Sequence, residues 1–152
     1  MNTYAFMGQS IRQDLDTSVH GLAWDRIRSK VLGADESEGQ GERIASWSLS
    51  PNMFSALRAR RLVRTRLATW GLAGPAAAAE RLAGELVADA VWQARGSYRL
   101  TVWATGGLLR CEVEVEVEAA TGALTQRHPD VFEQLACCWG TSDKTLWFEL
   151  PA

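Results

Sequence analysis

Apolar residues recur at helical spacing in three long stretches of the chain, at residues 10–32, 52–72 and 75–94. In each stretch they return at every third or fourth position, which is typical of an amphipathic α-helix. Ser50 and Pro51 predict a capped start for the second helix, and Gly71 indicates its end. The third stripe is the most regular, and its small residues predict close packing: Ala79, Leu82, Ala83, Leu86, Val87, Ala90, Val91 and Ala94.

Alternating apolar and polar residues predict four strands. The segment RIASWSLS suits a short first strand, and KTLWFEL predicts a last one at residues 144–150. Between them, SYRLTVWAT and LLRCEVEVEV flank Gly106 and Gly107, which form a strong hairpin turn signal.

A tight turn at these glycines fixes the hairpin register by counting. One face then carries the apolar pairs Val102–Cys111, Leu100–Val113 and Tyr98–Val115, and the other carries the polar pairs Trp103–Arg110, Thr101–Glu112 and Arg99–Glu114. Two interpretations of the glutamates from Glu112 to Glu118 remain open. They form either a solvated face that resists edge aggregation or a docking surface for a basic partner.

Residues 129–139 predict a short last helix that Gly140 ends. The body is therefore β-α-α-β-β-α-β, an α+β two-layer sandwich with a mixed, mainly antiparallel sheet covered by helices on one face. The stretch from Ala34 to Glu42 has the composition of a linker. It divides the chain into an N-terminal helical extension, 1–42, and a body, 43–152.

Composition narrows the class of protein. A chain of 152 residues with 47% hydrophobic content can bury one core. The net charge of −2 gives no general attraction to nucleic acid or anionic membrane. Neither a signal peptide nor an apolar run of about 20 residues is present, so we expect a soluble cytoplasmic protein. Three cysteines without metal-like spacing predict inert thiols rather than disulfides or a zinc site.

Several segments together resemble a known family. They are ARRLVRTRLATWGL (59–72), ERLAGELVADAV (80–91), the hairpin containing LLRCEV, the WG pair at 139–140 and DKTLWFELP (143–151). In order and spacing they are similar to the histidine-kinase-like ATPase (GHKL) superfamily, and within it to the bacterial anti-sigma-factor serine kinases and small ATP-binding regulatory proteins. The resemblance covers about residues 43–152 and implies the family's ATPase fold.

The resemblance also implies a nucleotide site. The family's helical glutamate, a general base, corresponds to Glu85, and its magnesium-binding asparagine corresponds to Asp89, four residues later on the same helical face. Asp89 departs from the family residue, although its carboxylate could ligate Mg²⁺. Lys144 and Thr145 correspond to a segment near the phosphates of ATP. A solvated acidic face is the simpler interpretation of the Glu85–Asp89 pair.

Two further parts of the family's site are missing. The adenine-binding aspartate falls near Val115, where no acceptor side chain stands, and the second glycine-rich turn falls at residues 126–128, where no glycine remains. We therefore expect a degenerate pseudoenzyme, an anti-sigma-factor-like transcription regulator in which binding of ATP and Mg²⁺ is weak or lost. The alternative is an active serine/threonine kinase of the anti-sigma-factor type that phosphorylates an antagonist protein.

The expected partner is a protein: a sigma factor, an antagonist or another transcription regulator. Five arginines crowd one helix, Arg58, Arg60, Arg61, Arg64 and Arg66, in a region that the family uses for dimerisation and sigma-factor binding. A homodimer is therefore also open. DNA is not favoured because the chain lacks net basicity and a helix-turn-helix signature. Trp24, Trp92 and Trp103 are candidate interface residues, and Trp103 could instead stack on Arg110.

Overall fold

The structure is a computed structural model that describes residues 42–93, 96–116, 124–142 and 144–152. The helix predicted at residues 10–32 lies outside these residues, as does most of the predicted linker. Glu42, which we assigned to the linker, is the first residue of strand β1 (Glu42–Leu49).

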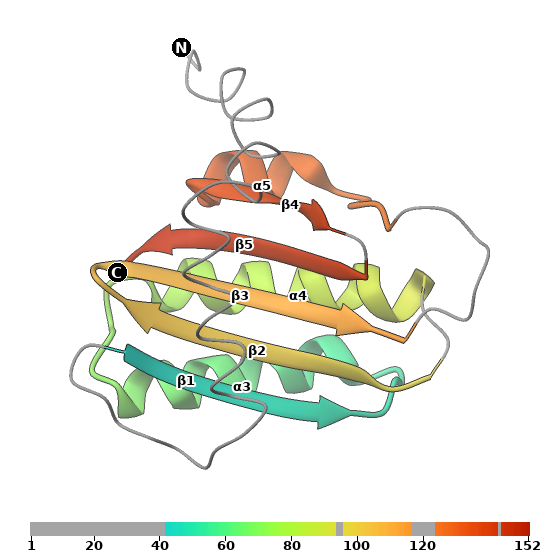
Figure 1. Ribbon diagram of the computed structural model, residues 1–152, viewed down its shortest axis with the longest axis horizontal. Coiled ribbons are helices and arrows are strands. Elements are labelled where there is room, and N and C mark those ends of the chain that lie inside the picture. Colours follow the sequence, from blue (N-terminus) through green and yellow to red (C-terminus); the bar gives the residue numbers. More distant parts are fainter. Residues whose placement is uncertain (1–41, 94–95, 117–123, 143) are drawn as a thin grey trace.

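Five strands form one sheet in the order β1-β2-β3-β5-β4 (Figure 1). The others are β2 (Tyr98–Thr105), β3 (Leu108–Val115), β4 (Cys138–Ser142) and β5 (Thr145–Pro151). Every neighbouring pair within the described part is antiparallel. The expectation of a mixed sheet is therefore wrong for these residues, because each strand runs opposite to its neighbours.

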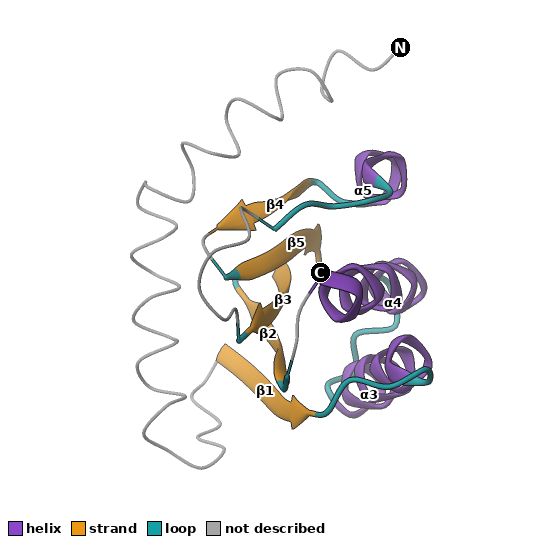
Figure 2. Ribbon diagram, turned by 90° about the vertical axis from the view of Figure 1, so that its right-hand side faces the viewer, coloured by secondary structure: helices purple, strands orange, loops and turns teal. Residues whose placement is uncertain are grey.

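Helices α3 (Ser55–Thr69), α4 (Ala76–Gln93) and α5 (Pro129–Leu135) lie together on one side of the sheet (Figure 2). The predicted α+β class is confirmed. Helices α3 and α4 run antiparallel, so the start of α3 lies beside the end of α4. We call the opposite side of the sheet the open face, since none of the described helices lies on it.

The core lies between the helices and the inner face of the sheet. Its largest fully buried side chains are Val63, Leu67, Leu82, Leu86 and Val87 from α3 and α4, Leu100, Val102, Leu109, Val113, Leu146 and Phe148 from the strands, and Phe132 from α5. Alanines on facing stripes of α3 and α4, among them Ala59, Ala79 and Ala83, let the two helices approach closely. The predicted stripe of α4 is confirmed from Ala79 to Ala90.

The predicted hairpin register is confirmed pair for pair, from Tyr98 opposite Val115 to Trp103 opposite Arg110. Gly106 and Gly107 both have positive φ, at 54° and 77°. Two consecutive residues with positive φ give the turn whose twist matches that of the strands, and glycine adopts this backbone without steric cost.

The start of α3 differs from the prediction. The helix begins at Ser55 rather than after Ser50-Pro51. Asn52 accepts the backbone N–H of Phe54 through its side chain at 2.7 Å, and the Ser55 hydroxyl accepts the N–H of Asn52 at 2.8 Å. These local bonds hold a turn that competes with helix and delays its start.

The last predicted helix is too long. Helix α5 ends at Leu135, and Ala136 is extended with ψ 143°. Residues 138–142 form the edge strand β4, which pairs with β5. The apolar residues at Cys137 and Cys138 are compatible with both a helix and a strand. Tertiary pairing decides the outcome, because β4 satisfies the free backbone edge of β5.

Candidate functional site

The C-terminal half of α4 carries the two acidic residues that the resemblance singles out. Glu85 is half-buried, whereas Asp89 is only 2% exposed. They are one helical turn apart, so the structure places both on the same side of α4. Asp89 also interacts with Arg127 and His128, which belong to the segment 124–128 that leads into α5.

Asp89 is bound to that segment. The backbone N–H of Arg127 donates a hydrogen bond to Oδ2 of Asp89 at 3.1 Å. Burial raises the pKa of the Asp89 carboxyl, and the negative charge of Glu85 adds to the rise. The Arg127 hydrogen bond and the charges of His128 and Arg127 act in the opposite direction. The carboxylate thus serves a structural contact at a considerable desolvation cost.

Two further contacts join the same segment to the end of α4. Gln93 binds Thr125 through both ends of its side-chain amide, accepting the Thr125 N–H at 2.7 Å and donating to the Thr125 carbonyl. The Arg127 guanidinium lies 4.3 Å from the centre of the Trp92 ring. Leu124 is buried in the core. We call these contacts, together with the Asp89–Arg127 bond, the α4 clasp.

Lys144 and Thr145 lie elsewhere. They stand at the start of β5, where the Lys144 carbonyl accepts the Val115 N–H at 2.9 Å. Lys144 is exposed. Leu146 and Phe148 point into the core, so alternation directs Thr145 to the open face, opposite Glu114. The sheet therefore separates the Thr145 side chain from Asp89, and the structure does not bring the four candidate residues together.

Other contacts occupy the two positions at which the resemblance implies an adenine-binding aspartate and a glycine-rich turn. Val115, at the expected adenine-binding position, is 2% exposed and belongs to the core. At the expected glycine-rich turn, Arg127 directs its backbone N–H to Asp89, and the side-chain amide atoms of Gln126 are buried without a hydrogen-bond partner. The Arg127 N–H is thus engaged within the protein.

An exposed apolar group at the start of α3 escaped the sequence reasoning. Met53 is 88% exposed, Phe54 62% and Leu57 46%, and the neighbouring Arg58 and Arg61 are exposed as well. We call these five residues the α3 patch. The helical period could have revealed Leu57, since it lies off the buried stripe of Ser55, Ala59, Val63 and Leu67. The arginines drew attention to this helix, but its apolar residues did not.

Of the candidate interface tryptophans that the structure describes, one is exposed and one is buried. Trp92 is 67% exposed, as its place off the α4 stripe indicates, whereas Trp103 is 2% exposed on the open face. The Arg110 guanidinium lies 4.3 Å from the centre of the Trp147 ring.

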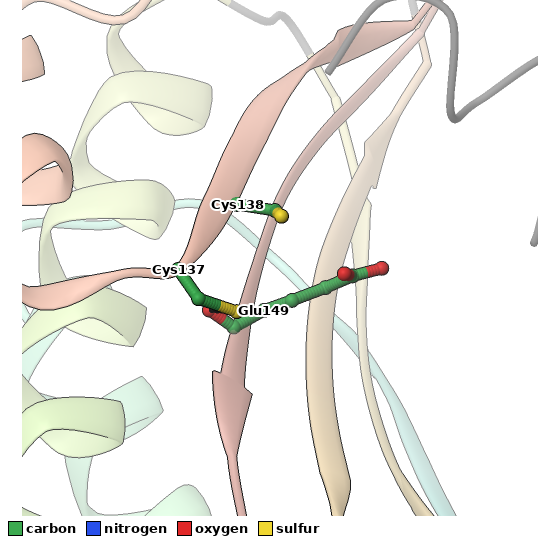
Figure 3. A group of neighbouring side chains, drawn as sticks. All are labelled: Cys137, Cys138 and Glu149. Atoms are coloured by element: carbon green, nitrogen blue, oxygen red, sulfur yellow. Dashed lines mark hydrogen bonds between the residues drawn. The ribbon is translucent and has the colours of Figure 1, made fainter. Parts of the chain in front are cut away.

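Cys137, Cys138 and Glu149 offer three ligand atoms within 4.8 Å of one another. Figure 3 shows the Glu149 side chain reaching over β3, where Nη1 of Arg110 binds its Oε1 at 2.8 Å. Hydrogen bonding to Cys138 and burial raise the pKa of the Cys137 thiol, which disfavours the thiolate that a metal requires. A group whose carboxylate is already paired does not carry a metal assignment.

No family model and no curated protein matches this chain. Among the described helices, none combines the length and the apolar character that crossing a membrane requires.

Proposed function

We propose that the protein is a non-catalytic regulator that acts by binding another protein, with its nucleotide binding weak or lost. The α4 clasp is the observation that carries this proposal. Asp89, where the resemblance expects the magnesium ligand, is buried and accepts a backbone N–H of the chain itself. Mg²⁺ needs near-octahedral oxygen coordination and keeps several of its waters, for which a carboxylate engaged in this way leaves little room.

The replacements at Val115 and Arg127 support the same conclusion. Val115 supplies no acceptor for an adenine amino group. An anion-binding turn needs several backbone N–H groups that converge on the phosphates. The Arg127 N–H is committed to Asp89 instead. In this proposal, the α+β fold serves the chain as a scaffold rather than as a nucleotide site.

The α3 patch is the surface that we propose for the partner. Large apolar side chains that are exposed side by side favour a protein interface, and arginine is enriched at the centres of interfaces. The patch suits a partner that presents apolar side chains next to carboxylates. The sequence of the chain resembles the anti-sigma-factor proteins. We therefore propose a sigma factor, an antagonist or another transcription regulator as the class of partner to test.

The variant Phe54→Asp/Leu57→Asp tests this surface. We expect the full chain to retain a specific protein from its native cells and the variant to lose it, at an unchanged melting temperature, because both residues are exposed. Ala77→Asp, which places a carboxylate at an exposed apolar position of α4 outside the α3 patch, is the control and should retain the partner. Equal retention by the patch variant would contradict the proposal.

The kinase alternative predicts another pattern. Glu85→Ala should leave partner binding and regulation intact if the protein is a scaffold, since Glu85 then has no chemical task. If the captured partner is phosphorylated by the full chain with ATP but not by Glu85→Ala, the protein is an enzyme and the scaffold proposal fails.

A further inference from the structure

The open face carries a buried band of polar and aromatic side chains. Paired residues of neighbouring antiparallel strands share a face, so the register places Trp103, Arg110 and Glu149 in one row across β2, β3 and β5, and Thr101, Glu112 and Trp147 in the next. All six are between 2% and 7% exposed. We call them the open-face band. The expectation that Glu112 is solvated is wrong.

The charges of the band are paired with each other. Arg110 donates through Nε to Glu112 at 2.9 Å and through Nη1 to Glu149 at 2.8 Å. Burial alone would lower the pKa of Arg110, but the charges of Glu112 and Glu149 raise it. An ion triad on a solvated face would keep much of its surface in water. This one has lost nearly all of it, although none of the described helices lies on the open face (Figure 2).

The band is bordered by more exposed residues on β2 and β3. In the next row on one side, Arg99 and Glu114 are exposed, although Thr145 of the same row on β5 is buried. On the other side, Thr105 and Leu108 are partly exposed. Rows on one face of a strand are about 6.8 Å apart. A helix with its side chains is about 10 Å wide, so a single helix laid across the strands covers two rows. A second sheet packed face to face would cover the outer rows as well.

We propose that residues 10–32 of this same chain form the helix that lies across the open-face band. The proposal goes beyond the proposed function and does not depend on it. A helix of these residues would be about 34 Å long at 1.5 Å per residue, while five strands at about 4.8 Å spacing span about 19 Å. Its apolar stripe comprises Ile11, Leu15, Val19, Leu22, Ile27 and Val31.

Connectivity and charge favour this occupant. Residues 1–41 precede β1, and Ile44, two residues into β1, is paired with Trp103 of the band. Residues 33–41 can reach about 30 Å when extended, which suffices to bring the chain from the band to the edge strand. The segment also carries Arg26, Arg28 and Lys30 close together. They complement the carboxylates of Glu114 and Glu116, which are exposed beside the band.

Thiol reactivity tests the proposal in the full chain. In a Cys137→Ser/Cys138→Ser background, Thr101→Cys places a probe inside the band, and Arg99→Cys places a matched probe on the same strand outside it. We expect a thiol reagent to react with position 101 more than about tenfold more slowly than with position 99. Adding Leu15→Asp and Leu22→Asp should remove the protection of position 101 and leave the reaction rate of the thiol at position 99 unchanged.

Protection of position 101 that survives these substitutions, in protein that still melts cooperatively, would overturn the proposal. Protection that depends on protein concentration would also overturn it, because the cover would then be a second copy. If the aspartate variant fails to fold, a benzophenone amino acid at position 22 gives the second test. We expect intramolecular cross-links to β2, β3 or β5. Cross-links to α3 or α4, to another copy or to nothing would contradict the proposal.

Discussion

Charged residues of the same type differ in solvent exposure in this protein, according to where they lie in the fold. Glu112 and Glu114 belong to the same alternating stretch of β3, yet Glu112 is 4% exposed and bound to Arg110 while Glu114 faces solvent. Asp89 is likewise buried on a helix whose next acidic neighbour, Glu85, is half-exposed. Sequence periodicity assigns such residues to a face. It cannot show which segment covers that face.

Asp89→Asn tests the cost of the buried carboxyl. Because burial raises the pKa of Asp89 above its ordinary 3.8, the folded protein holds this proton more tightly than the unfolded chain does. Stability is therefore lost as the pH rises from 3.8 through the raised folded pKa. The asparagine is neutral and keeps an oxygen acceptor for the Arg127 N–H. We expect it to raise the free energy of unfolding at pH 7, with the gain vanishing below pH 3.8.

Urea unfolding of both proteins at pH 3 to 8 measures this difference. An Asp89→Asn protein that is less stable than the original at pH 7, or whose gain is the same at every pH, would show that the carboxylate is stabilising where it lies.

At the scale of elements, the helices and the central hairpin could be predicted because their signals are local. The α4 stripe needs only its own period, and Gly106-Gly107 sets the register of β2 and β3 by counting. Strand β4 could not be predicted, since residues 138–142 become a strand through pairing with β5. The α4 clasp was also missed, because it joins Asp89 and Gln93 to a segment more than 30 residues away in sequence.

The packing of α3 on α4 gives a prediction at this scale. A Cβ at Gly84 would lie 2.3 Å from Nε and 3.0 Å from Cγ of Arg60, which crosses the helix there. In a helix, alanine is favoured over glycine by about 1 kcal/mol. We expect Gly84→Ala nevertheless to lower the free energy of unfolding by about 1–2 kcal/mol, since Arg60 must be displaced.

In an Arg60→Ala background the same substitution should stabilise the protein by up to about 1 kcal/mol, because only the helix propensity remains. A double-mutant cycle by urea unfolding isolates the coupling between the two positions. Equal effects of Gly84→Ala in both backgrounds would mean that Arg60 does not occupy the space above the glycine.

At the scale of the whole molecule, an α+β scaffold presents three different surfaces. The helical side carries the α3 patch, which is apolar and basic. The α4 clasp fills the region beside Asp89 that the family resemblance would give to a nucleotide. The open-face band is the third surface, and we propose that the chain covers it with its own N-terminal segment. We propose that a protein arranged in this way regulates by contact, without chemistry at Glu85.

Titration of the purified full chain with Mg-ATP by calorimetry, up to millimolar nucleotide, tests this central claim most directly. The α4 clasp predicts no saturable heat from protein that is shown to be folded by a cooperative melting transition. Saturable binding with a stoichiometry near one and a micromolar Kd would contradict the account, because it would require the clasp to open and Asp89 to face the nucleotide.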